Sequence, residues 1–427
     1  MVPRRANDPP PDPSRDRRRP PCPGRRSRRT ADARAARVVP ASAAQRRPRL
    51  IRLLTTNPRS TSICYSISQI PQCKETPVTY SPLSKDLAWL PADLEDQSRW
   101  IYRLTPADIK DIENALAASK AAGATIETLT KETFPLDIFD DALALTLDRL
   151  ENDLGLFVLR GLPVERFTKD ELRLIYWGIG LHMGTARSQS FKGDVLGDVR
   201  DFGQSAVTQT GRGYMSREGL GFHTDSADIV ALFVLRTAKS GGRSLFCSSV
   251  AVADEIARTR PDLFEVLQQP FYHSWKGSER PGEKPYYRQP IFSIEDGRFS
   301  SRWVAPHIWS AQEFEDVPPL TDAQTEAMKL LISLNDDPRF HTSMMFEPGD
   351  FQFLNNHVVY HARTEFEDWE DEDRKRHLLR LWLAPANSRP LSEGMREFYG
   401  DVRPGVPRGG FPARVDDPVF VTQDQKA

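Results

Sequence analysis

The pattern of apolar and polar positions changes near residue 220. Before that point, helix-start signals and helical patterning predict three helices, at residues 104–123, 140–155 and 168–180. Between the last two, the run LFVLRGLP (156–163) predicts a short buried strand followed by a turn. One strand among three helices is therefore expected in this part of the chain.

Capping signals fix where the first and third of these helices begin. Thr105 is a candidate N-cap, and Pro106 follows it at the first helical position, where a missing N–H costs nothing. Thr168 and Glu171 have the spacing of a capping box, in which each side chain bonds the other residue's backbone N–H. Gly123 ends the first helix.

From about residue 220 the chain consists mainly of short apolar runs separated by turns such as EDG and EPGD. The runs lie at residues 228–235, 243–249, 290–303, 342–356, 357–364 and 377–385. Two helical patterns, at 252–269 and 321–336, fall between them. This alternation predicts a mainly β fold, with a β-barrel-like core wrapped by flanking helices.

The two ends of the chain follow neither pattern. Residues 1–85 are rich in Arg and Pro and have no apolar periodicity, so we expect them to be disordered. An Arg-rich, acid-poor leader is also typical of mitochondrial import, although its prolines oppose the amphipathic helix that import requires; a misassigned gene start is a third reading. Residues 396–427 are rich in Pro and Gly, and we expect a loose tail. One folded domain is thus predicted at 86–395.

Charge is divided unevenly between the leader and the rest. Residues 1–80 hold 18 of the 58 Lys and Arg residues and 5 of the 59 Asp and Glu residues, which leaves 40 basic and 54 acidic groups, net −14, beyond them. A body that acidic repels a phosphate backbone, so no nucleic-acid partner is expected for the folded part.

Cysteine usage and hydropathy bear on the compartment. The four cysteines, Cys22, Cys64, Cys73 and Cys247, lack CxxC spacing, and no disulfide framework is implied, which suits a reducing compartment. No uncharged apolar run of 18 residues occurs, so no membrane span is predicted. We expect a cytoplasmic protein, and the leader leaves a mitochondrial one open.

Candidate chemistry begins with the stretch GFHTDSADIVALFVL. His223 and Asp225 are two residues apart, and on a strand residues at that spacing point to the same face. An imidazole and a carboxylate placed in this way can bind one ion from the same side. The tripeptide alone is a weak signal, because one such pair arises readily by chance.

A third ligand must come from a separate segment, and residues 347–368 supply both His357 and His361. Two histidines and one carboxylate, without cysteine, are typical of Fe(II) oxygenases, and zinc hydrolases use similar ligands. An iron oxygenase of this kind also needs a buried arginine for the far carboxylate of a dicarboxylate co-substrate. Arg376 and Arg380 lie in an otherwise apolar segment and are candidates for that role.

The order of these motifs resembles one family. His-x-Asp, then SGGRSLFCS, PGDFQFLNNHVVYHAR and RHLLRLW, is similar to the taurine dioxygenase and dichlorophenoxyacetate dioxygenase family of Fe(II)/2-oxoglutarate-dependent oxygenases, particularly its fungal members. The resemblance covers roughly residues 125–388. It implies a double-stranded β-helix, or jelly roll, and oxidation of a C–H bond in a small molecule with Fe(II), 2-oxoglutarate and O2.

The resemblance also assigns roles to individual residues. It implies that His223, Asp225 and His361 bind iron. His357, which lies on the same predicted strand face as His361, stays the rival third ligand. Ser244 and Arg376 match the 2-oxoglutarate-binding positions, and Arg380 matches an arginine that some members use for an anionic substrate. Because the loop at 367–375 is longer here than in the family, the choice between Arg376 and Arg380 as the co-substrate clamp stays open.

The substrate pocket is defined only by its position. The segment GRGYMSREGLGF leads directly into the predicted iron strand, so Arg212, Tyr214 and Ser216 are candidates for its mouth. The sequence does not identify the substrate, and it leaves both a monomer and a homo-oligomer open. A zinc-bound or metal-free jelly-roll binding module is the alternative function, although it would have no use for Ser244 and Arg376 beside the metal.

Overall fold

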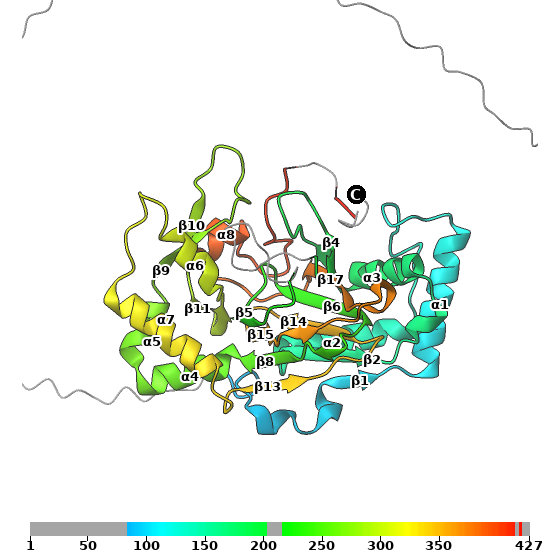
Figure 1. The fold of residues 1–427 in the computed structure, drawn as a ribbon, viewed down its shortest axis with the longest axis horizontal. Helices are drawn as coiled ribbons and strands as arrows, with labels where there is room; N and C mark the ends of the chain where they lie inside the picture. The colour runs from blue at the N-terminus through cyan, green and yellow to red at the C-terminus, as the bar shows by residue number, and fades with distance from the viewer. Residues whose placement is uncertain (1–82, 203–215, 415–417, 421–427) are drawn as a thin grey trace, which may run out of the picture. The chain divides into compact units, whose positions relative to one another are not determined.

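The computed structural model describes residues 83–202, 216–414 and 418–420, and its centre is a pair of β-sheets (Figure 1). The larger sheet has the order β1 (Ile101–Arg103), β2 (Leu156–Arg160), β14 (Phe351–Asn355), β6 (Ile229–Arg236), β17 (His377–Ala384) and β3 (Thr185–Ala186), and β4 (Leu196–Val199) also pairs with β17. The smaller sheet has the order β13 (His341–Met344), β8 (Ser244–Ser248), β15 (Val359–Arg363) and β5 (Leu220–His223). Within these two sheets all pairs are antiparallel except β1 with β2.

Three smaller pairs of strands and the helices complete the fold. The pairs are β9 (Pro270–Ser274) with β10 (Tyr286–Pro290), β11 (Phe292–Glu295) with β12 (Arg298–Ser301), and β7 (Ser240–Gly241) with β16 (Phe366–Glu367). The α-helices are α1 (Pro106–Ala121), α2 (Ile138–Asn152), α3 (Lys169–Met183), α4 (Ser249–Thr259), α5 (Pro261–Leu267), α6 (Ala305–Ala311), α7 (Asp322–Asn335) and α8 (Arg396–Tyr399). Short 3₁₀ turns lie at Pro91–Leu94, Gln97–Arg99, Val164–Arg166, Glu372–Arg374 and Glu393–Met395.

Strand β6 shows why its sequence is a continuous apolar run. Ala231 and Phe233 face outward into a core shared with α1, α2 and α3. Val230 and Val234 face inward into a second core, which contains residues of the smaller sheet and of α4, α5 and α7. A strand buried on both faces has no polar side, so the alternation expected of a half-exposed strand is absent. The mainly β fold with flanking helices is confirmed, and its two largely antiparallel sheets agree with the jelly roll that the family resemblance implies.

The capping predictions are confirmed. The Thr105 hydroxyl accepts the Asp108 N–H, and the Asp108 carboxylate accepts the Thr105 N–H at 2.7 Å. Thr168 and Glu171 form the same reciprocal pair at the start of α3. The pattern at 252–269 is divided between α4 and α5, because Pro261 lacks the N–H that a continuous helix would need and instead begins α5.

The expectation of a loose tail is wrong for residues 396–414. Phe398 and Phe411 belong to the inner core, and Arg408 is 1% exposed. Gly409 has φ of +71°, and an added Cβ there would lie 2.8 Å from the Ser226 carbonyl oxygen. The Pro- and Gly-rich segment is therefore irregular but closely packed, because its glycines allow the backbone to approach neighbouring residues such as Ser226.

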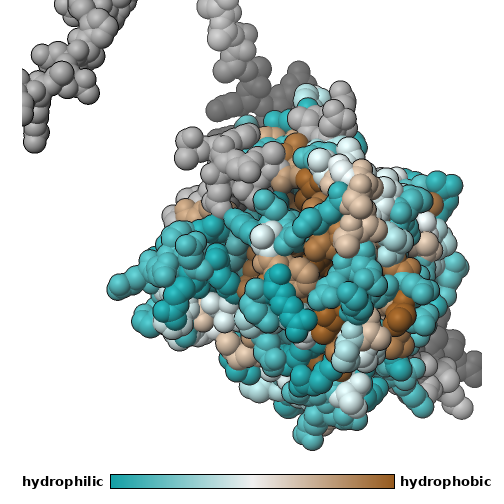
Figure 2. Space-filling model, turned by 90° about the vertical axis from the view of Figure 1, so that its right-hand side faces the viewer, coloured by the Kyte–Doolittle hydropathy of each residue, from teal (hydrophilic) through white to brown (hydrophobic). Residues whose placement is uncertain are grey.

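The surface of the folded part is mainly hydrophilic on the side shown in Figure 2, where hydrophobic residues gather in narrow bands between hydrophilic ones. No helix among the described residues is long and apolar enough to cross a membrane. The predicted leader, 1–85, lies almost entirely outside the described residues, which begin at 83.

Candidate metal centre and its cavity

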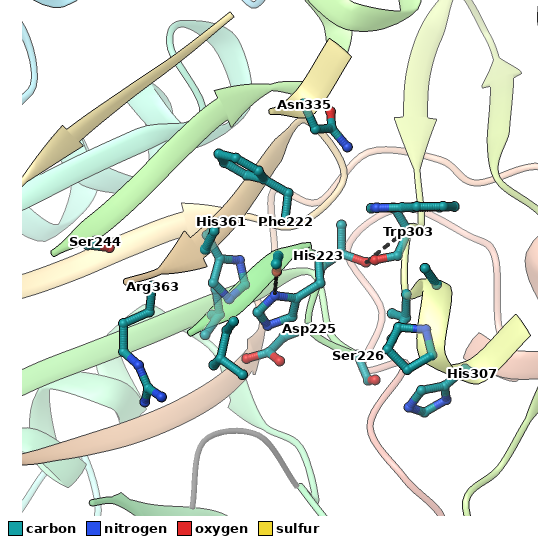
Figure 3. A pocket seen from close by; sticks show the side chains of 18 of the residues that line it. Phe222, His223, Asp225, Ser226, Ser244, Trp303, His307, Asn335, His361 and Arg363 are labelled. Carbon is teal, nitrogen blue, oxygen red and sulfur yellow. Dashed lines mark hydrogen bonds between the residues drawn. The ribbon is translucent and has the colours of Figure 1, made fainter. Parts of the chain in front are cut away.

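Three side chains of metal-ligand type converge where β5 meets β15 (Figure 3). His361 lies opposite His223 in the antiparallel pairing of the two strands, and the ring centroids are 4.3 Å apart. Asp225 follows the end of β5, and the candidate ligand atoms of the three residues lie within 4.8 Å of one another. They form the one group of this composition among the described residues.

Asp225 reaches this position from a loop, which differs from the strand placement that the sequence predicts. Strand β5 ends at His223, and the chain turns where the Thr224 N–H donates to the Trp303 carbonyl at 2.8 Å. The Asp225 N–H then donates to the side-chain oxygen of Asn356 at 3.0 Å. Contacts with Trp303 and Asn356 thus direct the carboxylate toward the two histidines.

The Asp225 carboxylate is held on one oxygen and free on the other. Oδ2 accepts from Trp382 Nε1 at 2.8 Å and from Arg380 Nη1 at 3.3 Å, whereas Oδ1 takes no hydrogen bond from the described residues. Burial alone would raise the pKa of Asp225, but the charge of Arg380 and the nearby histidines and Trp382 lower it below its ordinary value. A buried carboxylate with one free oxygen is suited to bind a cation.

Both imidazoles keep one ring nitrogen that has no hydrogen-bond partner among the described residues. Nδ1 of His223 donates to the Gly221 carbonyl at 2.9 Å, which leaves Nε2 available. Nδ1 of His361 is buried without a partner among the described residues. Burial and the neighbouring His223 lower the pKa of His361 to about 3, so its ring is neutral, as a metal ligand must be.

The three residues border a cavity of about 540 Å³. In Figure 3 Ser244 and Arg363 lie on one side of the histidines, and Trp303 and His307 lie on the other. Gly242 and Arg376 also line the cavity, as do Lys276, Trp309 and Phe411. Arg376 lies with Arg363 over the ring of Phe366, and Phe411 stacks with His307, so the cavity has one side with two arginines and another with aromatic rings.

Arg376 is the buried arginine that a dicarboxylate co-substrate would need. It is 4% exposed, and its Nη1 has no partner among the described residues. Its backbone N–H donates to Asp368, and Gly242 packs near its side chain, where an added Cβ would lie 3.5 Å from Nε. Burial, with a further contribution from the charge of Arg363, lowers the pKa of Arg376 to about 9.

Ser244 and Arg380 also line the cavity, but both already have partners. The Ser244 hydroxyl, at the start of β8, donates to Gln352 Oε1 at 3.3 Å. Arg380 donates from Nε to Gln189 Oε1 at 2.7 Å and from Nη1 to Asp225. Of the two candidate clamps, Arg376 therefore has the free guanidinium nitrogen.

Other predicted residues do not meet at the cavity. His357, the rival ligand, lies in the turn before β15, where its Nε2 pairs with Asp228 Oδ1 at 2.8 Å, and it does not line the cavity. Ser216 is buried outside the lining, and Arg212 and Tyr214 lie outside the described residues.

Three residues that line the cavity or hold its side chains in place were not predicted from the sequence. Gln189 and Asn356 hold Arg380 and Asp225 from distant segments, and no local pattern marks either of them. Arg363 did carry a signal, since it follows His361 by two residues and so shares its face of β15.

Comparison with known proteins gives one family model and several relatives. Residues 119–382 match the family described as taurine catabolism dioxygenase TauD, TfdA family. FR-33289 synthase of Streptomyces rubellomurinus is 33% identical over 317 residues, covering 72% of this chain and 92% of that protein. The taurine hydroxylase-like protein SAT17 of the fungus Stachybotrys chartarum is 29% identical over 309 residues, covering 70% of this chain and 79% of that protein.

Solved structures give the same architecture. The non-heme iron oxygenase OrfP, in complex with Fe and alpha-ketoglutaric acid, aligns with a TM-score of 0.51 at 17% sequence identity. The alignment covers 66% of this chain and 93% of that one. At this identity the likeness establishes the fold alone.

Proposed function

The chain belongs to the taurine catabolism dioxygenase TauD, TfdA family, and from that premise we propose that His223, Asp225 and His361 are its iron ligands. Like its family, it is an Fe(II)- and 2-oxoglutarate-dependent dioxygenase that oxidises a C–H bond of a small organic substrate. When bound, iron and 2-oxoglutarate supply the oxidation: one oxygen atom of O2 enters the substrate, and the other enters the succinate that forms with release of CO2.

The single observation that carries the assignment is the set of free ligand atoms facing one cavity. Two imidazoles and one carboxylate, with no cysteine, match the donor set that holds Fe(II) on one face. Trp382 and Arg380 orient the Asp225 carboxylate by donating to its Oδ2. The Gly221 carbonyl accepts from Nδ1 of His223 and so fixes the tautomer of that ring. The residues present therefore fit Fe(II).

We assign the co-substrate to the side of the cavity that holds Ser244 and Arg376. A carboxylate entering there can accept hydrogen bonds from Nη1 of Arg376, which has no partner among the described residues. Ser244 places a hydroxyl in the same lining. Arg380, which the sequence left as an alternative clamp, is assigned to Asp225, because its bonds to Gln189 and Asp225 hold the guanidinium in place.

The substrate is assigned to the opposite side, which Trp303, Trp309 and Phe411 line. Apolar rings exclude water from the reacting C–H bond and present it toward the metal position. His307 and Lys276 supply polar contacts there. The substrate is described only as a small organic molecule. That the protein has no nucleic-acid partner stays a prediction from the sequence, which leaves a monomer and a homo-oligomer open.

Succinate release tests the proposal. The whole chain, supplied with Fe(II), 2-oxoglutarate and O2, should form succinate slowly by itself and faster with a molecule that fits the aromatic side. The ligand assignment requires that His361→Ala eliminate both rates. Succinate formation by that variant at the wild-type rate would contradict it.

A further inference from the structure

Two buried arginines share one aromatic ring on the co-substrate side of the cavity. Arg363 is 7% exposed and Arg376 is 4% exposed, and both line the cavity. Their guanidinium carbons lie 4.9 and 5.1 Å from the centroid of Phe366. This side of the cavity therefore contains two positive charges, one more than a single carboxylate clamp needs.

Neither arginine forms an ion pair with a carboxylate in the part of the chain that the structure describes. Asp201 is the acid whose charge acts on Arg363, and it is in a salt bridge with Arg217 at 2.8 Å. Asp368 accepts from the backbone N–H of Arg376. The two buried positive charges repel each other, and an entering anion relieves that cost.

Arg363 is held so that part of its guanidinium remains available. Its Nη2 donates to the backbone carbonyls of Ser216 at 2.7 Å and Glu218 at 2.5 Å. Its Nε is buried and has no partner among the described residues, like Nη1 of Arg376. Each arginine thus keeps one buried donor for which the described protein supplies no acceptor.

We propose that Arg363 is a second binding residue for the distal carboxylate of 2-oxoglutarate, acting beside Arg376; the inference rests on the proposed function. Arg363 follows His361 by two residues on the same face of β15, so one strand carries both a metal ligand and a co-substrate ligand. This geometry favours an oxoacid with a second carboxylate over one with an apolar end.

The test compares two oxoacids that differ only at that end, 2-oxoglutarate and 2-oxopentanoate. Each is titrated without oxygen into the Fe(II)-loaded whole chain, and the visible band of the metal–oxoacid complex reports binding without turnover. Arg363→Met should weaken 2-oxoglutarate roughly tenfold, the size of one charged hydrogen bond, and leave 2-oxopentanoate within about twofold. Arg374→Met, an exposed arginine two residues before Arg376, is the control and should change neither.

The paired oxoacids separate the possible results. If Arg363 only fastens the backbone at residues 216–218, its loss weakens both oxoacids equally, and the inference is wrong. Unchanged 2-oxoglutarate binding in Arg363→Met also overturns it. If the wild-type chain binds Fe(II) but gives no band with 2-oxoglutarate, the proposed function itself fails.

A second variant keeps the inference testable if Arg363→Met does not fold. In Arg376→Met, Arg363 is intact, so 2-oxoglutarate should still bind several-fold more tightly than 2-oxopentanoate. Equal affinities in that variant would mean that Arg376 alone reads the distal carboxylate.

Discussion

The protein contains two clusters of acidic, histidine and arginine side chains. Their acids and histidines come from neighbouring positions of the sequence, but their hydrogen bonds differ. Asp228, His357 and Arg408 form the closed cluster, in which the histidine and the arginine both bond the acid. Asp228 Oδ1 accepts from His357 Nε2 at 2.8 Å and from Arg408 Nε at 2.9 Å. The Oδ2 of Asp228 and the Nδ1 of His357 lack described partners, but neither residue lines the cavity.

The open cluster comprises His223, Asp225, His361 and Arg380. Its arginine bonds the acid, yet no hydrogen bond joins the acid to either imidazole, and all four residues line the cavity. The two clusters share the same kinds of side chain, but the closed cluster is almost fully buried, whereas His223 and His361 are half-buried. The comparison teaches that a candidate site is marked by ligand atoms left unpaired toward a cavity, and that buried polar residues alone do not mark one.

The largest expected effect is on Fe(II) binding, which should depend on Asp225 of the open cluster and not on Asp228 of the closed cluster. Asp225→Ala should abolish Fe(II) binding at micromolar metal. Outer partners of a ligand account for roughly 10–100-fold in affinity, so loss of the ligand itself should exceed that. Equilibrium dialysis measures the loss, and circular dichroism checks that the barrel persists. A variant with full iron occupancy would remove Asp225 from the site.

Asp228→Ala should give the opposite result. Removing this acid leaves His357 and Arg408 without their shared partner, which should lower the free energy of unfolding by about 3–5 kcal/mol. Iron binding by the folded fraction should persist, because no ligand is lost. Urea denaturation gives the first quantity, and dialysis below the unfolding transition gives the second. If Asp228→Ala were as stable as the wild type but lost iron binding, the closed cluster and not the open one would be the metal site.

Arg376 and Arg380 both line the cavity, but only Arg380 belongs to the open cluster, and their variants should therefore differ. Arg376→Ala should raise the KM for 2-oxoglutarate about 30-fold, since losing a buried charge partner costs about 2–5 kcal/mol. Arg376→Lys should rescue only partly, because a point charge cannot replace a bidentate fork. Arg380→Ala should leave that KM nearly unchanged and weaken iron binding through Asp225. If Arg380→Ala raised the KM for 2-oxoglutarate and Arg376→Ala did not, Arg380 would be the residue that binds the distal carboxylate.

The smallest expected effect is the pH dependence of the closed cluster. Burial lowers the pKa of His357 from 6.5 to about 4, so the folded protein favours the neutral ring. The unfolded chain binds a proton more readily between these values, so this contribution to stability is complete above pH 6.5 and is lost as the pH falls toward 4. Thermal melting across that range should show a decline that His357→Asn makes shallower. An equal slope in both proteins would assign the decline to other groups.

Local signals predicted most of the framework. Thr105, Pro106 and the Thr168–Glu171 box act through neighbours three residues away, so they are visible in the sequence without tertiary information. The apolar runs gave β6, β14 and β17 for the same reason. The packed segment at 396–414 was missed, because glycines at 409 and 410 serve close backbone contacts with residues 226 and 188 that composition cannot reveal.

The residues proposed as iron ligands could be picked out from the sequence, whereas the residues that hold them in place could not. His223, Asp225 and His361 stood out through their spacing and the order of motifs, although Asp225 proved to lie in a loop. The rival histidine could be dismissed only from tertiary contacts, since Asp228 occupies it across 129 residues of sequence. Gln189 is equally remote from Arg380, at a separation of 191 residues.

The two histidines of the segment 357–361 provide the most direct test that the open cluster is the iron centre. Fe(II) and 2-oxoglutarate are added without oxygen to wild-type protein, His361→Ala and His357→Ala, each well below its melting temperature, and the visible band of the metal–oxoacid complex is recorded. The account predicts the band in the wild type and in His357→Ala, and its absence in His361→Ala. A band that survives in His361→Ala and disappears in His357→Ala would contradict it.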